Sequence, residues 1–257
     1  MNVVLVGNTD YAELALWAFF LFFIGLVIYL RREDHREGYP MEEDSGAVGA
    51  PGLFHPRDKR FKLAHGLGLV YKPGPREYEV PNIAARRVSS YAGSPIEPTG
   101  NPLIDGVGPA AWANRLDVPD TMWEGGHPKI VPLELSHGFT VARQDRNPIG
   151  MPVFGCDDKM AGVCTNIWVD QSERLIRYFE VRTLGDAARS VTVPMAMAQV
   201  NQRSGKIRVD AIRSDQFDAA PVLASTSQIT RLEEEKLVGY FGGGYLYAKR
   251  SRIEPLL

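Results

Sequence analysis

Residues 11–30 have the sequence YAELALWAFFLFFIGLVIYL, an apolar run whose one charge is Glu13, and RREDHREGYP follows it at once. At about 1.5 Å of rise per residue, a helix of this length spans about 30 Å, the thickness of the hydrocarbon core of a bilayer. The run therefore predicts one transmembrane helix. A cleaved signal peptide is the alternative, but it would need a basic stretch before a shorter apolar core and small residues at a cleavage site.

The charges on either side of this run predict its orientation. Arg31, Arg32 and Arg36 follow it, whereas residues 1–10 contain no Lys or Arg. Because basic residues are retained on the cytoplasmic side, we expect residues 1–10 to be periplasmic and the chain after the helix to be cytoplasmic. The run contains no His to ligate a haem or chlorophyll and no paired charges, so it is expected to anchor the chain or to pack against other helices.

The composition argues against several classes of function. The chain has 29 Lys and Arg residues and 31 Asp and Glu residues, which gives no support for nucleic-acid binding. Cys156 and Cys164 form no CxxC or Cys/His motif, and a disulfide is not expected in a reducing cytoplasm. The sequence has no serine-hydrolase, zinc-protease, P-loop or dinucleotide-binding motif, which makes a membrane-anchored enzyme the weakest of the alternatives.

The segment after the apolar run is rich in Gly and Pro up to about residue 109 and shows no sustained helical period. Stretches such as YKPGPREYEVPN and SPIEPTGNP have the chemistry of turns and extended chain. The segment is too long for an ordinary loop, yet it retains aromatic residues that disordered chains lack. We therefore expect residues 31–109 to be an irregular segment that covers a partner.

Short strands are predicted from about Lys129 onward. The segments KIVPLEL, GVCTNIWVD, IRYFEVRT, SVTVPM and KIRVDAI alternate in polarity or are rich in β-branched and aromatic residues. In KIRVDAI, for example, Ile207, Val209 and Ala211 share one face, as the strand period of two requires. Several short strands with tight turns indicate a small antiparallel barrel, closed or strongly curled. Residues 110–257 are thus predicted to form a mainly β cytoplasmic domain.

The end of the chain, SQITRLEEEKLVGYFGGGYLYAKR, predicts a short helix. Ser227 or Thr230 can serve as its N-cap, and the acidic residues 233–235 lie in the first turn, where the helix dipole favours them. The three glycines at 242–244 are expected to end it.

The sequence segments, taken in order, carry a resemblance. The apolar run followed by LRREDHREGYP, then EPTGNPLIDGVGPAAW, NPIGMPVFGCD, IWVD and EEEKLVGYFGGGYLYA, resembles the H subunit of purple-bacterial photosynthetic reaction centres. The resemblance implies a single-pass protein of the photosynthetic inner membrane, with a cytoplasmic domain built on the small barrel known as the PRC-barrel. It implies a non-pigmented structural subunit without catalytic activity of its own.

The same resemblance implies partners. The chain would cap the cytoplasmic face of the L and M subunits, which hold the bacteriochlorophylls, bacteriopheophytins, quinones and non-haem iron, and it would bind none of these cofactors itself. A light-harvesting antenna would surround the complex, and a cytochrome subunit would lie on the opposite side of the membrane. A membrane-tethered PRC-barrel adaptor without pigment partners is the alternative function.

Asp170, Glu173 and Arg177, in IWVDQSERLIR, are the first candidate site. By sequence alone Asp170 and Glu173 lie in an ordinary charged turn between two strands, with Arg177 beyond it. The resemblance implies that all three face the L subunit beneath the secondary quinone. Reducing a quinone to quinol consumes two protons, and a proton path requires protonatable groups within hydrogen-bond reach of one another. We expect Glu173 and Asp170 to transfer protons and Arg177 to tune these carboxylates.

His127, in LDVPDTMWEGGHPK, is a candidate entry point for protons, because imidazole exchanges protons near neutral pH. Asp120 and Glu124 could feed it. The alternative is a solvated His in a glycine-rich turn. Relatives with two histidines in this loop could hold a metal ion there, but this chain has one, so no metal site is predicted.

The residues that follow the membrane run are of mixed charge, which is typical of a membrane interface. Arginines at this level can hold anionic lipid headgroups. We expect Arg31, Arg32, Arg36 and Tyr39 to contact lipids and neighbouring subunits rather than to take part in catalysis.

Overall fold

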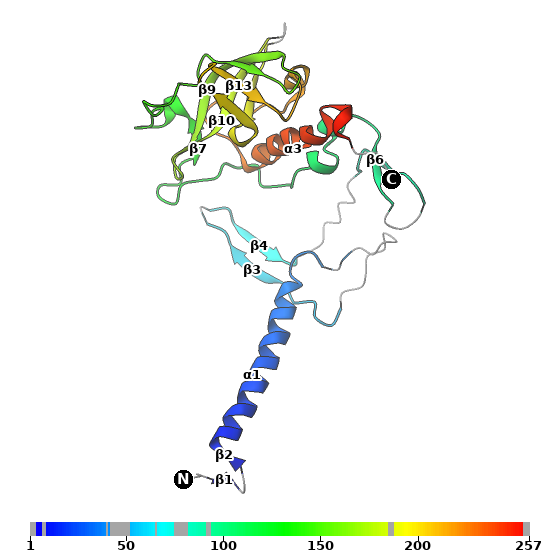
Figure 1. The fold of residues 1–257 in the computed structure, drawn as a ribbon. Helices are drawn as coiled ribbons and strands as arrows, with labels where there is room; N and C mark the ends of the chain where they lie inside the picture. Colours follow the sequence, from blue (N-terminus) through cyan, green and yellow to red (C-terminus); the bar gives the residue numbers. More distant parts are fainter. Residues whose placement is uncertain are drawn as a thin grey trace. The chain divides into compact units, whose positions relative to one another are not determined.

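The computed structural model describes residues 4–6, 9–39, 41, 52–64, 66–74, 82–90, 94–184 and 188–253. The chain divides into two units, which are described separately. The first consists of Met1–Pro81 with Ser89–Pro95, and the second of Asn82–Val88 with Ile96–Leu257 (Figure 1).

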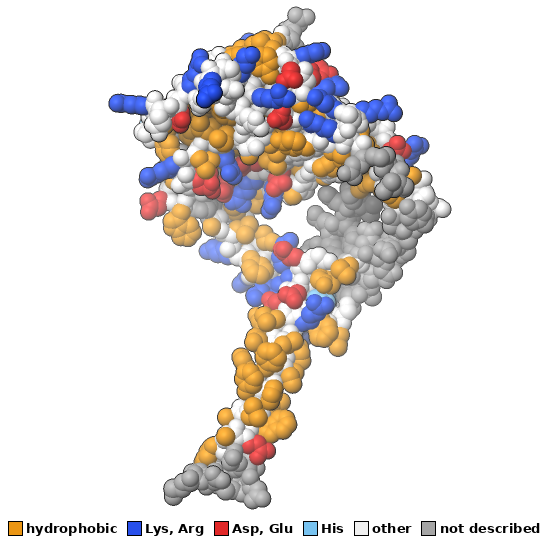
Figure 2. Space-filling model, viewed as in Figure 1, with side chains coloured by type: hydrophobic (Ala, Val, Ile, Leu, Met, Phe, Trp, Pro, Cys, Tyr) orange, Lys and Arg blue, Asp and Glu red, His pale blue; other side chains and the backbone are white. Residues whose placement is uncertain are grey.

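The long helix α1, Tyr11–Asp34, dominates the first unit and follows the short strands β1 (Val4–Val6) and β2 (Thr9–Asp10). It continues four residues beyond Leu30, where the apolar run ends. None of its residues is buried, and apolar side chains cover it along its length (Figure 2). A helix that is apolar all round and unburied in its own chain is typical of a membrane span, and α1 is long enough to be one.

A β-hairpin is attached to the end of α1. Strands β3 (Lys59–Lys62) and β4 (Leu69–Lys72) pair antiparallel. The Arg36 side chain, just after α1, donates hydrogen bonds of 2.9 Å to the carbonyl oxygens of Arg57 and Lys72 at the two ends of the hairpin. This hairpin lies within the segment predicted to be irregular, and it escaped prediction because its strands bury no apolar face.

The second unit contains one seven-stranded sheet and the helix α3. The strand order is β11-β10-β9-β8-β13-β12, with β7 on the free side of the end of β9. The sheet strands are β7 (Ile130–Pro132), β8 (Pro152–Phe154), β9 (Met160–Asp170), β10 (Leu175–Thr183), β11 (Ser190–Pro194), β12 (Ala198–Asn201) and β13 (Lys206–Val209).

Shorter elements complete this unit. They are the hairpin strands β5 (Ala85–Arg87) and β6 (Ile96–Pro98), the helix α2 (Pro102–Asp105), and the 3-10 helices η1 (Gly108–Ala110), η2 (Leu133–Leu135), η3 (Met195–Met197), η4 (Ser214–Ala219) and η5 (Arg250–Arg252).

The mainly β fold class predicted from the sequence is confirmed, with two additions. Strands β8 and β12 were not predicted, because each is short and has few β-branched residues. The pairing of β8 with β13 is parallel, whereas only antiparallel pairs were expected. Ile207, Val209 and Ala211 are fully buried, as their alternation predicted. They belong to one core with Trp168, Phe179 and other sheet residues, which α3 also enters through Leu237 and Phe241.

Helix α3, Arg231–Tyr247, begins after Thr230, the second of the two N-cap candidates in the sequence. Thr230 is its N-cap: the Thr230 hydroxyl accepts a hydrogen bond from the amide of Glu233, and the Glu233 carboxylate accepts one from the amide of Thr230. The two side chains satisfy amides that otherwise lack partners at a helix start.

The predicted end of this helix at 242–244 is wrong, because α3 continues through the glycines. Their role is to allow close packing. A Cβ on Gly243 would lie 2.5 Å from Cβ of Ala110 in η1, and one on Gly244 would lie 2.4 Å from the carbonyl oxygen of Ala211. Only glycine permits such an approach, so the helix accepts the lower propensity of glycine in exchange for packing.

Candidate functional site

The turn between β9 and β10 holds the carboxylate of Asp170, the last residue of β9. This side chain is fully buried, and its Oδ1 accepts hydrogen bonds of 2.9 Å from the amides of Ser172 and Glu173. An aspartate that accepts from amides two and three residues further on fixes the start of a turn. Arg174 completes the turn with φ of 56°, in the left-handed region.

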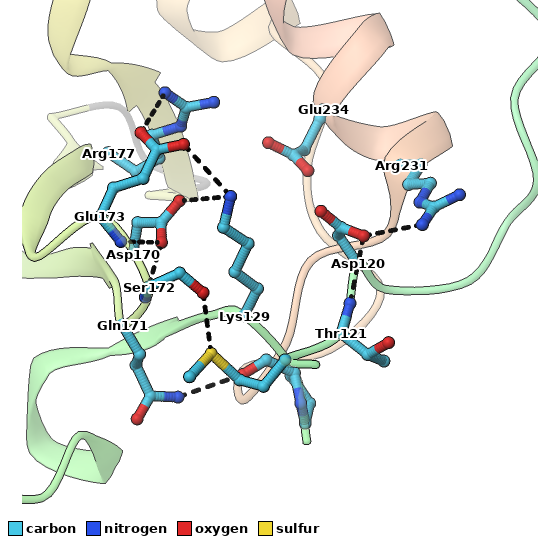
Figure 3. A network of polar contacts seen from close by, with 12 residues as sticks. Asp120, Thr121, Lys129, Asp170, Gln171, Ser172, Glu173, Arg177, Arg231 and Glu234 are labelled. Atoms are coloured by element: carbon cyan, nitrogen blue, oxygen red, sulfur yellow. Dashed lines mark hydrogen bonds and ion pairs between the residues drawn. The ribbon is translucent and has the colours of Figure 1, made fainter. Parts of the chain in front are cut away.

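Lys129 provides the positive charge next to this buried carboxylate. Because β7 pairs antiparallel with β9, with Ile130 opposite Asp170, Lys129 lies beside the turn. Its Nζ is 3.2 Å from Oδ2 of Asp170 and 3.3 Å from Oε1 of Glu173 (Figure 3). Burial lowers the pKa of Lys129, but the two carboxylates outweigh burial and raise it. Among the described residues, none donates a hydrogen bond to Oδ2 of Asp170. The ion pair with Lys129 therefore offsets the cost of burying this oxygen.

Glu173 connects this buried pair to the surface. Its side chain is 49% exposed, and its second carboxylate oxygen lies 3.9 Å from the guanidinium of Arg177. The charges therefore alternate from Asp170 through Lys129 and Glu173 to Arg177, from a fully buried group to exposed ones (Figure 3).

Asp120 belongs to a second pair close by. A backbone hydrogen bond in the loop before β7 holds Asp120 next to Lys129: the amide of Lys129 donates to the carbonyl oxygen of Asp120. Its Oδ1 accepts a hydrogen bond of 2.7 Å from the guanidinium of Arg231, in the first turn of α3. Burial raises the pKa of Asp120, but Arg231 outweighs this and holds it below its ordinary value.

Glu234 also lies in the first turn of α3, but its pKa is raised whereas that of Asp120 is lowered. Its carboxylate accepts a 2.7 Å hydrogen bond from the hydroxyl of Tyr178 on β10. Burial raises the pKa of Glu234, and the hydrogen bond and the charge of Arg177 only partly offset it. A glutamate with a raised pKa exchanges protons closer to neutral pH than a solvated one does.

One cavity lies beside Glu234 and the Asp120–Arg231 pair. Its volume is about 730 Å³, and Asp120, Arg177, Tyr178, Arg231 and Glu234 all contribute to its wall. The apolar part of the wall comes from the start of β10, from η3 and from Val238 of α3. The cavity thus brings carboxylates from a loop and a helix to the same space as Arg177, near the start of β10.

Glu124 and His127 take part in none of the contacts described above. Both side chains are exposed in the loop between Asp120 and Lys129. Within the part of the chain that the structure describes, neither side chain makes a hydrogen bond or an ion pair. The described residues also contain no group of three or more His, Cys, Asp or Glu side chains that could hold a metal ion.

The residues predicted at the membrane interface behave differently from one another. The guanidinium of Arg36 binds partners within the chain: it donates to the two hairpin carbonyl oxygens, and its Nε lies 2.7 Å from the carboxylate of Glu33. The Tyr39 ring stacks on His35 at a centroid distance of 3.9 Å. Arg31 and Arg32 are exposed in the last turn of α1.

Sequence reasoning missed Lys129, Arg231, Tyr178 and Glu234. Glu234 was recognised only as one of three acidic residues in a first helical turn. A signal for Lys129 was present, because a lysine directly before a strand can reach the carboxylate that ends a neighbouring antiparallel strand. Using it requires the pairing of β7 with β9, which sequence alone does not provide.

The comparisons with known families agree with this architecture. Residues 3–135, more than half of the chain, match the family described as photosynthetic reaction centre, H-chain N-terminal region. Residues 141–216 match the PRC-barrel domain. The H chain associates with the L and M subunits of the reaction centre, and this family match together with the apolar helix α1 indicates a membrane-anchored protein. The chain therefore belongs to the family of photosynthetic reaction centre H chains.

Proposed function

We propose that this chain caps the cytoplasmic face of the L and M subunits and conducts protons to the secondary quinone site, without catalytic activity of its own. In this arrangement α1 crosses the photosynthetic inner membrane with its N-terminus in the periplasm. The partner subunits bind the bacteriochlorophylls, bacteriopheophytins, quinones and non-haem iron. A light-harvesting antenna and, on the periplasmic side, a cytochrome subunit complete the assembly.

The observation that carries the proposal is a graded series of ionisable groups at one place on the barrel. Asp170 is fully buried, and Lys129 links it to the half-exposed Glu173. Glu234 has a raised pKa and lines the same cavity as Arg177. A path for protons needs groups that run from solvent to the interior and that exchange protons near neutral pH.

The roles of the groups follow from their surroundings. Glu173 faces solvent and can collect a proton, while Glu234 can hold one because burial favours its neutral form. Lys129 and Arg177 keep positive charge beside these carboxylates and so control when they release protons. Exposed as they are, Glu124 and His127 suit proton collection at the surface rather than transfer within the cluster.

Substitution of Glu173 in the intact complex tests the proposal. The Glu173→Gln variant keeps the size of the side chain but cannot carry a proton at neutral pH. We expect the proton-coupled second electron transfer to the secondary quinone to slow by up to about 100-fold, the lower range of a positioned general acid. Primary charge separation, measured after the same flashes, stays unchanged.

The matched control is Glu134→Gln, which removes an exposed carboxylate of η2 outside the cluster. It should leave both rates unchanged. Equal proton uptake after flashes in Glu173→Gln and in the unsubstituted complex would refute the role of Glu173.

The barrel by itself would also suit a membrane-tethered adaptor without pigment partners. Gentle purification of the chain from native membranes separates the two functions. Pigmented material that contains the L and M subunits supports the proposal, whereas colourless material without them supports the adaptor.

A further inference from the structure

The β3–β4 hairpin is held at the end of the membrane helix. Helix α1 continues past its apolar run by residues 31–34, which add about 6 Å, roughly the depth of the headgroup layer. Arg36 then bonds both ends of the hairpin, and Lys59 forms an ion pair of 3.4 Å with Glu33 in the last turn of α1. With α1 in a bilayer, the hairpin therefore lies at the level of the lipid headgroups.

The two faces of the hairpin differ in their partners. Residues opposite each other in an antiparallel pair share a face. The inner face carries Lys59, Phe61, Val70 and Lys72, and the last three line a hollow with Glu33 and Arg36 of the helix end. Lys72 also lies 3.8 Å from Glu37. Both lysines of the inner face thus have carboxylate partners within the chain.

The outer face of the hairpin consists of Arg60, Lys62, Leu69 and Tyr71, all of them exposed. No carboxylate of the described residues forms an ion pair with Arg60 or Lys62. Both cations, together with Leu63 and Leu69, line a hollow of about 660 Å³. Leu69 and Tyr71 are half exposed beside the two cations.

We propose that this outer face binds the phosphate groups of anionic phospholipids in the leaflet at which α1 ends. Arg60 and Lys62 provide the positive charge, worth about a fivefold preference each near an anionic surface. Leu69 and Tyr71 suit the boundary between headgroups and acyl chains, where tyrosine is favoured. A membrane fits better than a protein partner because the hairpin is tied to the end of the membrane helix and its segment, residues 57–72, carries five Lys and Arg residues and one Asp.

Lipid selectivity of the intact complex tests this assignment. The complex is reconstituted in equimolar phosphatidylcholine and phosphatidylglycerol at low salt, and the association of spin-labelled forms of each lipid is compared. The double variant Arg60→Gln/Lys62→Gln should lower the preference for phosphatidylglycerol by up to about 30-fold, and high salt should lower it in the unsubstituted protein. The control Lys159→Gln/Arg203→Gln removes equal charge from exposed positions of the other unit and should leave the preference unchanged.

Two results would overturn it. One is an unchanged lipid preference in Arg60→Gln/Lys62→Gln. The other is loss of a protein subunit from this variant while the preference for phosphatidylglycerol is kept, which would assign the outer face to a protein.

A depth measurement gives an independent answer if the double variant does not assemble. A nitroxide is attached at Leu69→Cys, which is selective because Cys156 and Cys164 are both buried. We expect the label to be more accessible to oxygen and less to a water-soluble nickel complex than a label at Val222→Cys, an exposed position of the other unit. Equal access of the nickel complex to both labels would place the outer face in water and contradict the assignment. Nothing in this test depends on proton transfer.

Discussion

Helices α1 and α3 differ in how much of their surface is buried within the chain. Helix α1 has 24 residues and buries none of them within the chain, whereas α3 has 17 residues and buries six, three of which are glycines. Helix α1 therefore presents its apolar surface to a bilayer or to other subunits. Helix α3 has glycines at buried positions, which allow its backbone to pack closely against the rest of its own unit. Substitutions inside the second unit should thus destabilise the isolated chain, and equivalent ones in α1 should not.

Removing the charge of Lys129 should give the largest effect on stability. Lys129→Met leaves the fully buried Asp170 carboxylate without its ion-pair partner, which costs about 3–5 kcal/mol of unfolding free energy. Chemical denaturation in detergent measures this loss. The double variant Lys129→Met/Asp170→Asn should recover most of it, because no buried charge is then left unpaired. A loss in the double variant as large as in the single one would contradict the account.

Adding a methyl group to each helix compares them directly. Gly243→Ala places a Cβ 2.5 Å from the Ala110 Cβ and should cost about 1–3 kcal/mol by overpacking. Gly25→Ala in α1 meets no atom of the described residues within 4 Å and should leave the stability unchanged or raise it by up to about 1 kcal/mol. Melting temperatures of the two variants in the same detergent give the comparison. Equal destabilisation would mean that α1 packs within its own chain after all.

Loss of the cap of α3 should have a smaller effect. Thr230→Ala removes the hydroxyl that accepts from the Glu233 amide and should cost about 1 kcal/mol. Thr230→Ser keeps the hydroxyl and serves as the control in the same denaturation experiment. If both variants lose equal stability, the methyl group and not the cap is responsible.

The smallest expected effect is a change of pH dependence at Glu234. Its pKa is raised in the folded chain, so between the unfolded and the folded pKa the folded state binds more protons, and stability falls as the pH rises through this range. Glu234→Gln removes this contribution, so its unfolding free energy should decline less from acidic to neutral pH. A decline as steep as in the unsubstituted chain would mean that the Glu234 carboxyl is not stabilised in its neutral form.

Local patterns were predictable from the sequence, whereas contacts between distant residues were not. The alternation at 206–211 and an N-cap at Ser227 or Thr230 depend on neighbours in the chain; the structure confirms the alternation and identifies Thr230 as the cap. The glycines at 242–244 were misinterpreted, because a glycine in a helix ends it or permits close packing according to what lies beside it. In sequence nothing indicates that Ala110 lies there.

The candidate site follows the same division. The charged turn with Asp170 and Glu173, and Arg177 just beyond it, are visible because these residues are close in sequence, and the family resemblance implies a role for them. Lys129 and Glu234 come from segments far from that turn. Their place beside it depends on the pairing of β7 with β9 and on the packing of α3, which are tertiary features.

The addition of β7 to the edge of β9 has a consequence for how such chains can be recombined. The first family match ends at residue 135 and the second begins at residue 141. Nevertheless β7, within the first match, pairs with β9 of the second, and η1, also within the first match, packs against α3. In a chimera joined at that border, Asp170 would come from one relative and the residue at position 129 from another, so the Lys129–Asp170 ion pair could be lost. The border between inherited sequence modules is therefore not a border of cooperative folding. Exchange of segments between relatives should succeed more readily near residues 82–96, where the chain passes from one compact unit to the other.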